Sequence, residues 1–238
     1  MAHEPLHDGW LPRRLLGQGD PTGLDGAQRI HDHVAAIRST LERTDYLECG
    51  WPCWAAVPWL AAQFPGRLRV VHLVRHPVPV ALSWMANQAY CPPLLPMLPE
   101  KVLLSPLDDG VVLADYRGRW AALAPFEKAL FFWAEVNTFA LRCERTLGVP
   151  WLRVRFEDLF AGGGLAELLA FLDLPERPEV LAARCSREDQ FPAVTNQAWQ
   201  AAQILDHPAV ADLARALGYD PVGLDEGALR RRYCGAQP

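Results

Sequence analysis

Lysine is almost absent from this sequence of 238 residues, because Lys101 and Lys128 are the only lysines among 23 basic side chains. Neither lysine follows a glycine-rich loop, so neither can serve as the lysine of a phosphate-binding P-loop. The run GQGDPTG at residues 17–23 has the glycines of such a loop. It lacks a preceding strand and a closing Lys-Ser or Lys-Thr pair. The sequence therefore argues against a P-loop kinase, and a GC-rich bacterial genome explains the arginine bias more simply than phosphate binding does.

An excess of positive charge and long apolar runs are also missing. The formal net charge is −5, which argues against a general nucleic-acid binder or a protein of anionic membranes. No apolar run has the length of a signal peptide or a membrane span. We therefore expect a cytoplasmic protein without a membrane span, whose thiols stay reduced.

The cysteines and histidines do not have the spacing of a metal site. Among six cysteines, Cys49 and Cys53 are the only close pair, and no second pair matches them. His31 and His33 are two residues apart, so they cannot face one ligand from the same helix face. We predict that both histidines are exposed polar positions and that the protein holds no metal.

Residues 69–90 contain the clearest structural pattern of the sequence, a predicted strand followed by a predicted helix. The β-branched run from Val70 to Val74 predicts a buried parallel strand. Pro77 and the apolar residues after it predict a helix, because a proline in the first helical turn removes an N–H that has no partner there. Arg75 is thus expected at the carboxyl end of a strand and beside a helix N-terminus, where open α/β sheets bind anions.

The other predicted elements alternate between strands and helices over a chain that fits one domain, 1–238. Strands are expected at 46–48 and 151–156, and helices at 28–41, 54–64, 126–147, 165–172, 178–183 and 208–217. The segment 1–26 is predicted to be irregular, 91–125 an insertion or lid, and 220–238 a solvated tail. This order predicts an α/β fold with parallel strands and right-handed crossovers.

The central segment resembles the 3′-phosphate-binding segment of the PAPS-dependent sulfotransferases. That family follows a buried strand with Arg, usually Asp, and Pro, and places a Ser eight residues after the Arg. Arg75, Pro77 and Ser83 match this pattern, and His76 replaces the Asp. The resemblance implies a P-loop-NTPase-like fold of three layers, with a mostly parallel central sheet flanked by helices. It also implies that Arg75 and Ser83 bind the 3′-phosphate of PAPS or of adenosine 3′,5′-bisphosphate.

Two further stretches resemble the same family. The first is an R-x-x-x-E-D-L strand followed by a helix ending in F-L-x-L-P, here Arg153–Leu159 and Phe171–Pro175. The second is YLECGW at 46–51, a strand end that carries the catalytic base in this superfamily. The resemblance therefore makes Glu48 the candidate base, with a solvated or ion-paired glutamate as the alternative.

Residues of the later segments have weaker expected roles. The resemblance points to Arg184 and Arg187 as further basic groups at the 3′-phosphate, against the alternative that they are surface arginines. Glu157 is expected to be a structural acid after a strand rather than a catalytic one. Together these residues predict a sulfotransferase that moves a sulfuryl group to a hydroxyl or amine of a small molecule or sugar.

One element of the family is missing from this sequence, the glycine- and serine/threonine-rich loop that holds the 5′-phosphosulfate. We therefore expect that the chain is truncated at its N-terminus, through gene truncation or a wrongly chosen start, or that it is a paralogue without the loop. The alternative function is a non-catalytic nucleotide-binding or interaction protein of the same fold. Whether the protein forms a homodimer is left open.

Overall fold

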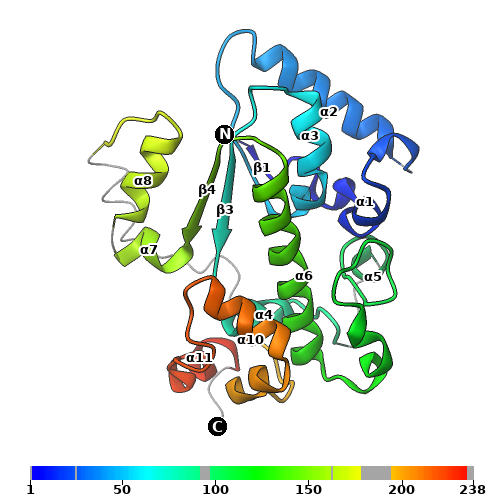
Figure 1. Cartoon of the computed structure of the whole chain (residues 1–238), viewed down its shortest axis with the longest axis vertical. Helices are drawn as coiled ribbons and strands as arrows, with labels where there is room; N and C mark the ends of the chain where they lie inside the picture. The colour runs from blue at the N-terminus through cyan, green and yellow to red at the C-terminus, as the bar shows by residue number, and fades with distance from the viewer. Residues whose placement is uncertain (1, 25, 92–96, 162, 178–193, 235–238) are drawn as a thin grey trace. The chain divides into compact units, whose positions relative to one another are not determined.

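A computed structural model describes residues 2–24, 26–91, 97–161, 163–177 and 194–234 (Figure 1). The chain forms two compact units, residues 1–66 with 93–122 and residues 67–92 with 123–238. The described helices include none that is both long and apolar enough to cross a lipid bilayer.

The first unit is mainly helical, with one short pair of strands. Its strands are β1 (Ala2–His3) and β2 (Glu48–Cys49), which pair in parallel with Ala2 opposite Glu48. Its α-helices are α1 (Pro12–Gln18), α2 (Ala27–Thr40), α3 (Val57–Gln63) and α5 (Met97–Lys101). Its 3-10 helices are His7–Trp10, Pro21–Gly23, Trp51–Ala56, Ala114–Gly118 and Trp120–Ala122.

The N-terminal segment is more ordered than the sequence predicted. Leu15 and Leu16 of α1 are buried, and this apolar contact outweighs the many glycines around it. Gly19 ends α1 with a φ of 71°, and its N–H bonds the carbonyl of Leu15. The GQGDPTG run is therefore a helix end followed by a 3-10 turn, and the prediction that it is no P-loop is confirmed.

The second unit contains a longer parallel strand pair. β3 (Val70–Val74) pairs with β4 (Trp151–Arg155) in parallel, from Val70 opposite Trp151 to Val74 opposite Arg155. Its α-helices are α4 (Pro77–Ala86), α6 (Pro125–Thr146), α7 (Phe156–Ala161), α8 (Gly164–Phe171), α10 (Pro208–Ala216) and α11 (Glu226–Tyr233), and Ala201–Asp206 forms a 3-10 helix.

The predicted fold class is confirmed in its coarse form. The protein is a helix-rich α/β structure with parallel strands, and each sheet formed by the described residues has two strands. The larger central sheet that the sequence predicted is not seen within these residues. The predicted helix at 178–183 lies outside the described part of the chain.

Helix α4, which follows β3, and helix α6 form a buried layer of the second unit. Four apolar side chains of α4 are at most 2% exposed, namely Val78, Ala81, Leu82 and Met85. Helix α6 packs along α4, and its own buried side chains include Phe126, Leu130, Phe131 and Trp133. Burial of each large apolar side chain stabilises the fold by roughly 2 kcal/mol, so the packing of α4 against α6 is a main source of stability in this unit.

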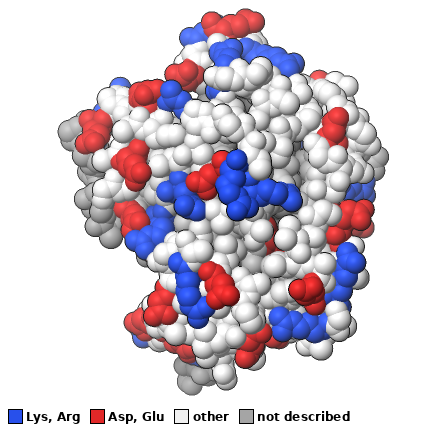
Figure 2. Space-filling model, in the orientation of Figure 1, with Lys and Arg blue, Asp and Glu red and all other residues white. Residues whose placement is uncertain are grey.

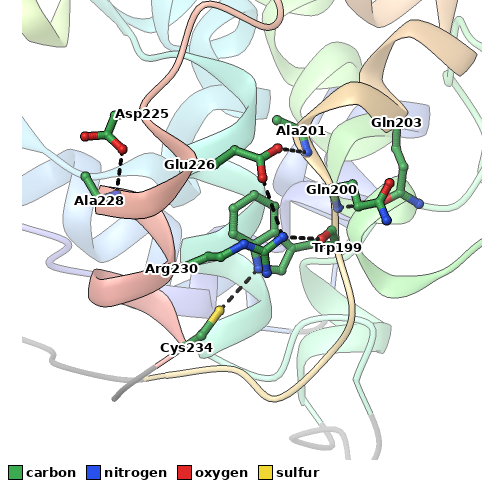
Figure 3. Close-up of polar contacts among 9 residues, drawn as sticks. All are labelled: Trp199, Gln200, Ala201, Gln203, Asp225, Glu226, Ala228, Arg230 and Cys234. Atoms are coloured by element: carbon green, nitrogen blue, oxygen red, sulfur yellow. Dashed lines mark hydrogen bonds and ion pairs between the residues drawn. The ribbon is translucent and has the colours of Figure 1, made fainter. Parts of the chain in front are cut away.

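The C-terminal segment is a docked helix, and the prediction of a solvated tail is wrong for it. The guanidinium of Arg230 lies 4.6 Å from the ring centre of Trp199, which is 4% exposed (Figure 3). Glu226 accepts a hydrogen bond from the N–H of Ala201. Trp199 Nε1 also lies 3.3 Å from the sulfur of Cys234. These polar contacts fix α11 although its sequence, EGALRRRY, has few apolar residues.

Candidate functional site

The backbone at the carboxyl end of β3 is fixed by side chains from two other segments. Trp133 of α6 donates its indole N–H to the carbonyl of Arg75 at 3.0 Å. The hydroxyl of Tyr219 lies 3.2 Å from the carbonyl oxygen of Val74. The carbonyl of Arg75 is therefore hydrogen-bonded, and that of Val74 has a hydroxyl in close contact.

The guanidinium of Arg75 lies over an aromatic ring. Its central carbon is 4.7 Å from the ring centre of Phe156, the first residue after β4. The side chain is half-buried, and within the described residues it makes no hydrogen bond or ion pair. A guanidinium held against an aromatic face keeps its N–H edge free, so Arg75 can still bind an anion.

The first turn of α4 offers no free N–H group, contrary to the anion site expected at its N-terminus. Pro77 and Pro79 have no N–H. The N–H of Val78 donates to Nδ1 of His76 at 3.2 Å, and that of Val80 bonds the His76 carbonyl. Any anion at this end of the sheet must therefore be bound by side chains.

Ser83 is the second predicted contact to the phosphate. It lies in α4 six residues after Pro77, which places it about 9 Å along the helix axis. Its side chain is half-buried, and its hydroxyl makes no hydrogen bond within the described residues. The hydroxyl is thus available as a donor, but no structural observation joins it to Arg75.

His76 is a neutral histidine that serves as a helix cap. Its Nδ1 accepts the N–H of Val78, and its Nε2 donates to the carbonyl of Asp220 at 2.9 Å. Burial lowers the pKa of His76, and the guanidinium of Arg75 acts in the same direction. An Asp at this position would carry a negative charge, whereas His76 caps the helix without one.

The carboxyl end of β4 carries a second, fully paired arginine. Arg155 makes two hydrogen bonds to the carboxylate of Asp158, at 2.8 and 2.9 Å, and a third to the carbonyl of Gly218. The hydrogen bond from Arg155 lowers the pKa of Asp158. Glu157 accepts the Tyr219 hydroxyl at 2.8 Å, which agrees with the structural role predicted for it.

A cleft lies beside β4, and the sequence did not predict it. Its volume is about 410 Å³, and its lining residues are Arg153, Val154, Arg155, Asp158, Gly163, Gly164 and Glu167. Arg75 and Ser83 are not among these residues. On the face drawn in Figure 2, Lys and Arg side chains lie mostly beside Asp and Glu side chains, as they do in this cleft.

Glu48, the predicted base, is part of a hydrogen-bonded cluster in the first unit. Its Oε2 lies 2.8 Å from Nε2 of His33 and 3.1 Å from the hydroxyl of Tyr46. Its Oε1 accepts the indole N–H of Trp10 at 3.3 Å.

The two histidines of α2 differ in exposure. His31 is exposed as predicted, but the same prediction is wrong for His33, whose side chain is 11% exposed. The contact between His33 and Glu48 could not be predicted from the sequence, because His33 belongs to α2 and Glu48 to β2.

The described residues give no further support for a phosphate, metal or thiol site. Arg184 and Arg187 lie outside the described residues. The described part of the chain contains no group of three or more His, Cys, Asp or Glu arranged to hold a metal ion. Burial, followed by the charge of Glu48, raises the pKa of Cys53 to about 12, so this thiol stays protonated and is a poor nucleophile.

The chain has a structural similarity to a domain of known function but no match in sequence comparisons. No protein-family model and no curated protein matches the chain. Among solved structures, the chain is similar to a sulfotransferase domain from the curacin biosynthetic pathway, with a TM-score of 0.42 and 17% sequence identity. The alignment covers 92% of this chain and 75% of that one.

Proposed function

We propose that the chain has the P-loop-NTPase-like fold of the sulfotransferases and binds the 3′-phosphate of PAPS at the carboxyl end of β3. Arg75 binds the phosphate through its guanidinium, and Ser83 adds a hydroxyl. The reaction is transfer of a sulfuryl group to a hydroxyl or amine of a small molecule or sugar. Glu48 is the residue proposed for the acid–base chemistry of the acceptor.

One observation carries this proposal, the state of the Arg75 side chain. Two other arginines of the second unit have a carboxylate partner, Arg69 in Asp173 and Arg155 in Asp158. Arg75 instead rests on Phe156 with its N–H edge free of any described partner. A half-buried guanidinium that has no carboxylate partner among the described residues is suited to bind an external anion.

A non-catalytic nucleotide-binding protein is the second candidate. It is favoured by the absence from this sequence of a glycine- and serine/threonine-rich loop for the 5′-phosphosulfate. Both candidates bind adenosine 3′,5′-bisphosphate, and the genomic sequence upstream of Met1 separates them. An in-frame strand followed by such a loop supports the enzyme, whereas a stop codon close upstream supports the non-catalytic protein.

Isothermal titration of the full chain with adenosine 3′,5′-bisphosphate tests the shared binding step. We expect a dissociation constant between about 1 μM and 1 mM, the range usual for enzyme substrates. Arg75→Ala should weaken binding by about 2 kcal/mol, roughly 30-fold, because a charged hydrogen bond is lost. Arg231→Ala, an exposed arginine of α11, is the control and should bind as the wild type does. Absence of binding heat in the wild type rejects the proposal.

A further inference from the structure

The carboxylate of Glu48 has little room to accept a proton from a ligand. Its Oε2 already takes two hydrogen bonds, from His33 and Tyr46, and its Oε1 takes one from Trp10. Burial raises the pKa of Tyr46, and the Glu48 charge adds to this, so the phenol remains a donor. Both lone pairs of Oε2 are thus directed at the protein.

This contact decides which nitrogen of His33 is free. When Nε2 donates its hydrogen to Glu48, the neutral ring carries its lone pair on Nδ1. Nδ1 of His33 has no hydrogen-bond partner within the described residues. It is also not among the fully buried polar atoms of the described residues that lack a hydrogen bond. Nδ1 therefore keeps some solvent-accessible surface, on a side chain that is 11% exposed.

The His33 ring is held in a fixed orientation. The ring of Trp10 meets it edge-on at 5.8 Å between centres, and that of Tyr46 at 6.2 Å. Its backbone belongs to the 14-residue helix α2, whose Ile30 and Val34 are at most 2% exposed. A histidine with one nitrogen on a carboxylate and the other open at the surface has the arrangement of a general base.

We propose that Nδ1 of His33 is the proton acceptor of this protein, and that Glu48 is the residue that positions it. The ligand is an alcohol or amine group, whose proton passes to Nδ1 as its oxygen or nitrogen bonds to the sulfur of PAPS. The bond between that sulfur and the 5′-phosphate oxygen breaks in the same step and releases adenosine 3′,5′-bisphosphate. The Glu48 carboxylate stabilises the imidazolium that forms, and the proton then passes to water. The identity of the transferred group rests on the proposed sulfuryl transfer, whereas the role of His33 as a base rests on the cluster itself.

Diethyl pyrocarbonate, which acylates an unprotonated imidazole nitrogen, tests the proposal on the full chain. Peptide mapping by mass spectrometry measures the rate at each histidine, and long-range ¹H–¹⁵N spectra report which ring nitrogen carries hydrogen. In the wild type we expect Nε2 of His33 to be protonated, Nδ1 to be bare, and His33 to react. In Glu48→Gln the rate at His33 should fall about tenfold, because a neutral amide supports the ring less than a carboxylate does.

His31→Gln is the matched control, since His31 is an exposed residue of the same helix, and it should leave the rate at His33 unchanged. Circular dichroism of each variant excludes unfolding as the cause of a change. The proposal is overturned if Nδ1 carries the hydrogen, if His33 does not react, or if Glu48→Gln reacts as the wild type does. A wild type that fails to bind adenosine 3′,5′-bisphosphate rejects sulfuryl transfer separately, without altering the reactivity of His33.

Discussion

The hydroxyl of Tyr219 lies 2.8 Å from Oε2 of Glu157 and 3.2 Å from the carbonyl oxygen of Val74. A single side chain thus joins the carboxyl ends of β3 and β4. Burial raises the pKa of Tyr219, and its hydrogen bond to Glu157 adds to this, so the hydroxyl remains a donor at ordinary pH. Arg75 follows β3 at this end of the sheet.

Tyr219→Phe should lower the free energy of unfolding by about 1 kcal/mol, because a hydrogen bond to a carboxylate and a close carbonyl contact are lost. Urea denaturation followed by circular dichroism measures this change. Tyr233→Phe is the matched control, because Tyr233 is buried but its hydroxyl has no hydrogen bond within the described residues. Equal stability of the Tyr219→Phe variant and the wild type would show that the contact is not formed in solution.

His72 should make the stability of the protein depend on pH. Burial lowers its pKa from 6.5 to about 4, and within the described residues its Nδ1 has no hydrogen-bond partner. The unfolded chain therefore binds a proton on this ring at a pH where the folded chain does not. Stability is full above pH 6.5 and declines as the pH falls toward 4. Between about pH 7 and pH 5.5 the loss from this group should be about 1 kcal/mol.

Urea denaturation at both pH values, on the wild type and on His72→Gln, isolates that contribution. The glutamine amide can still donate to Asn137, which accepts from His72 at 3.0 Å, but it does not titrate. The variant should therefore lose less stability between the two pH values than the wild type. The same loss in both proteins would mean that His72 is not the titrating group.

Arg230 should contribute measurably to stability although it is exposed. Its guanidinium lies on Trp199 and donates to the carbonyl of that residue at 3.3 Å. Arg230→Ala should lower the free energy of unfolding by about 1 kcal/mol. Arg231→Ala, at the next position of the same helix, should change it by less than about 0.5 kcal/mol. If the two variants are equally stable, α11 is frayed in solution, as the sequence had suggested.

Elements that depend on local apolar patterning could be predicted from the sequence. The strand at Val70–Val74 has the predicted bounds and parallel pairing. The prediction that it is buried is wrong, because only Val74 is buried and Leu73 is 49% exposed. Helix α6 begins at Pro125, one residue from the prediction. In these segments the residues that decide the structure are neighbours in the chain.

Features that depend on distant polar contacts could not be predicted. Helix α11 has too few apolar residues to show a periodic pattern, and its contacts reach Trp199 and Ala201. His33 looked like an exposed residue because its partner Glu48 comes from another element. The placement of Arg75 at a strand end was predictable, and so was the lack of an N–H at Pro77 and Pro79. The hydrogen bond that occupies the N–H of Val78 depends on the side chain of His76 and was not predicted.

The central claim is that Arg75 binds the phosphate on the ribose 3′-position, and a comparison of two nucleotides tests it most directly. Isothermal titration of the wild type and of Arg75→Gln with adenosine 3′,5′-bisphosphate and with adenosine 5′-monophosphate gives four dissociation constants. We predict that Arg75→Gln weakens binding of the bisphosphate roughly 30-fold, through loss of a charged hydrogen bond, and leaves that of the monophosphate unchanged. An equal loss for both nucleotides, or no loss for either, would contradict the claim.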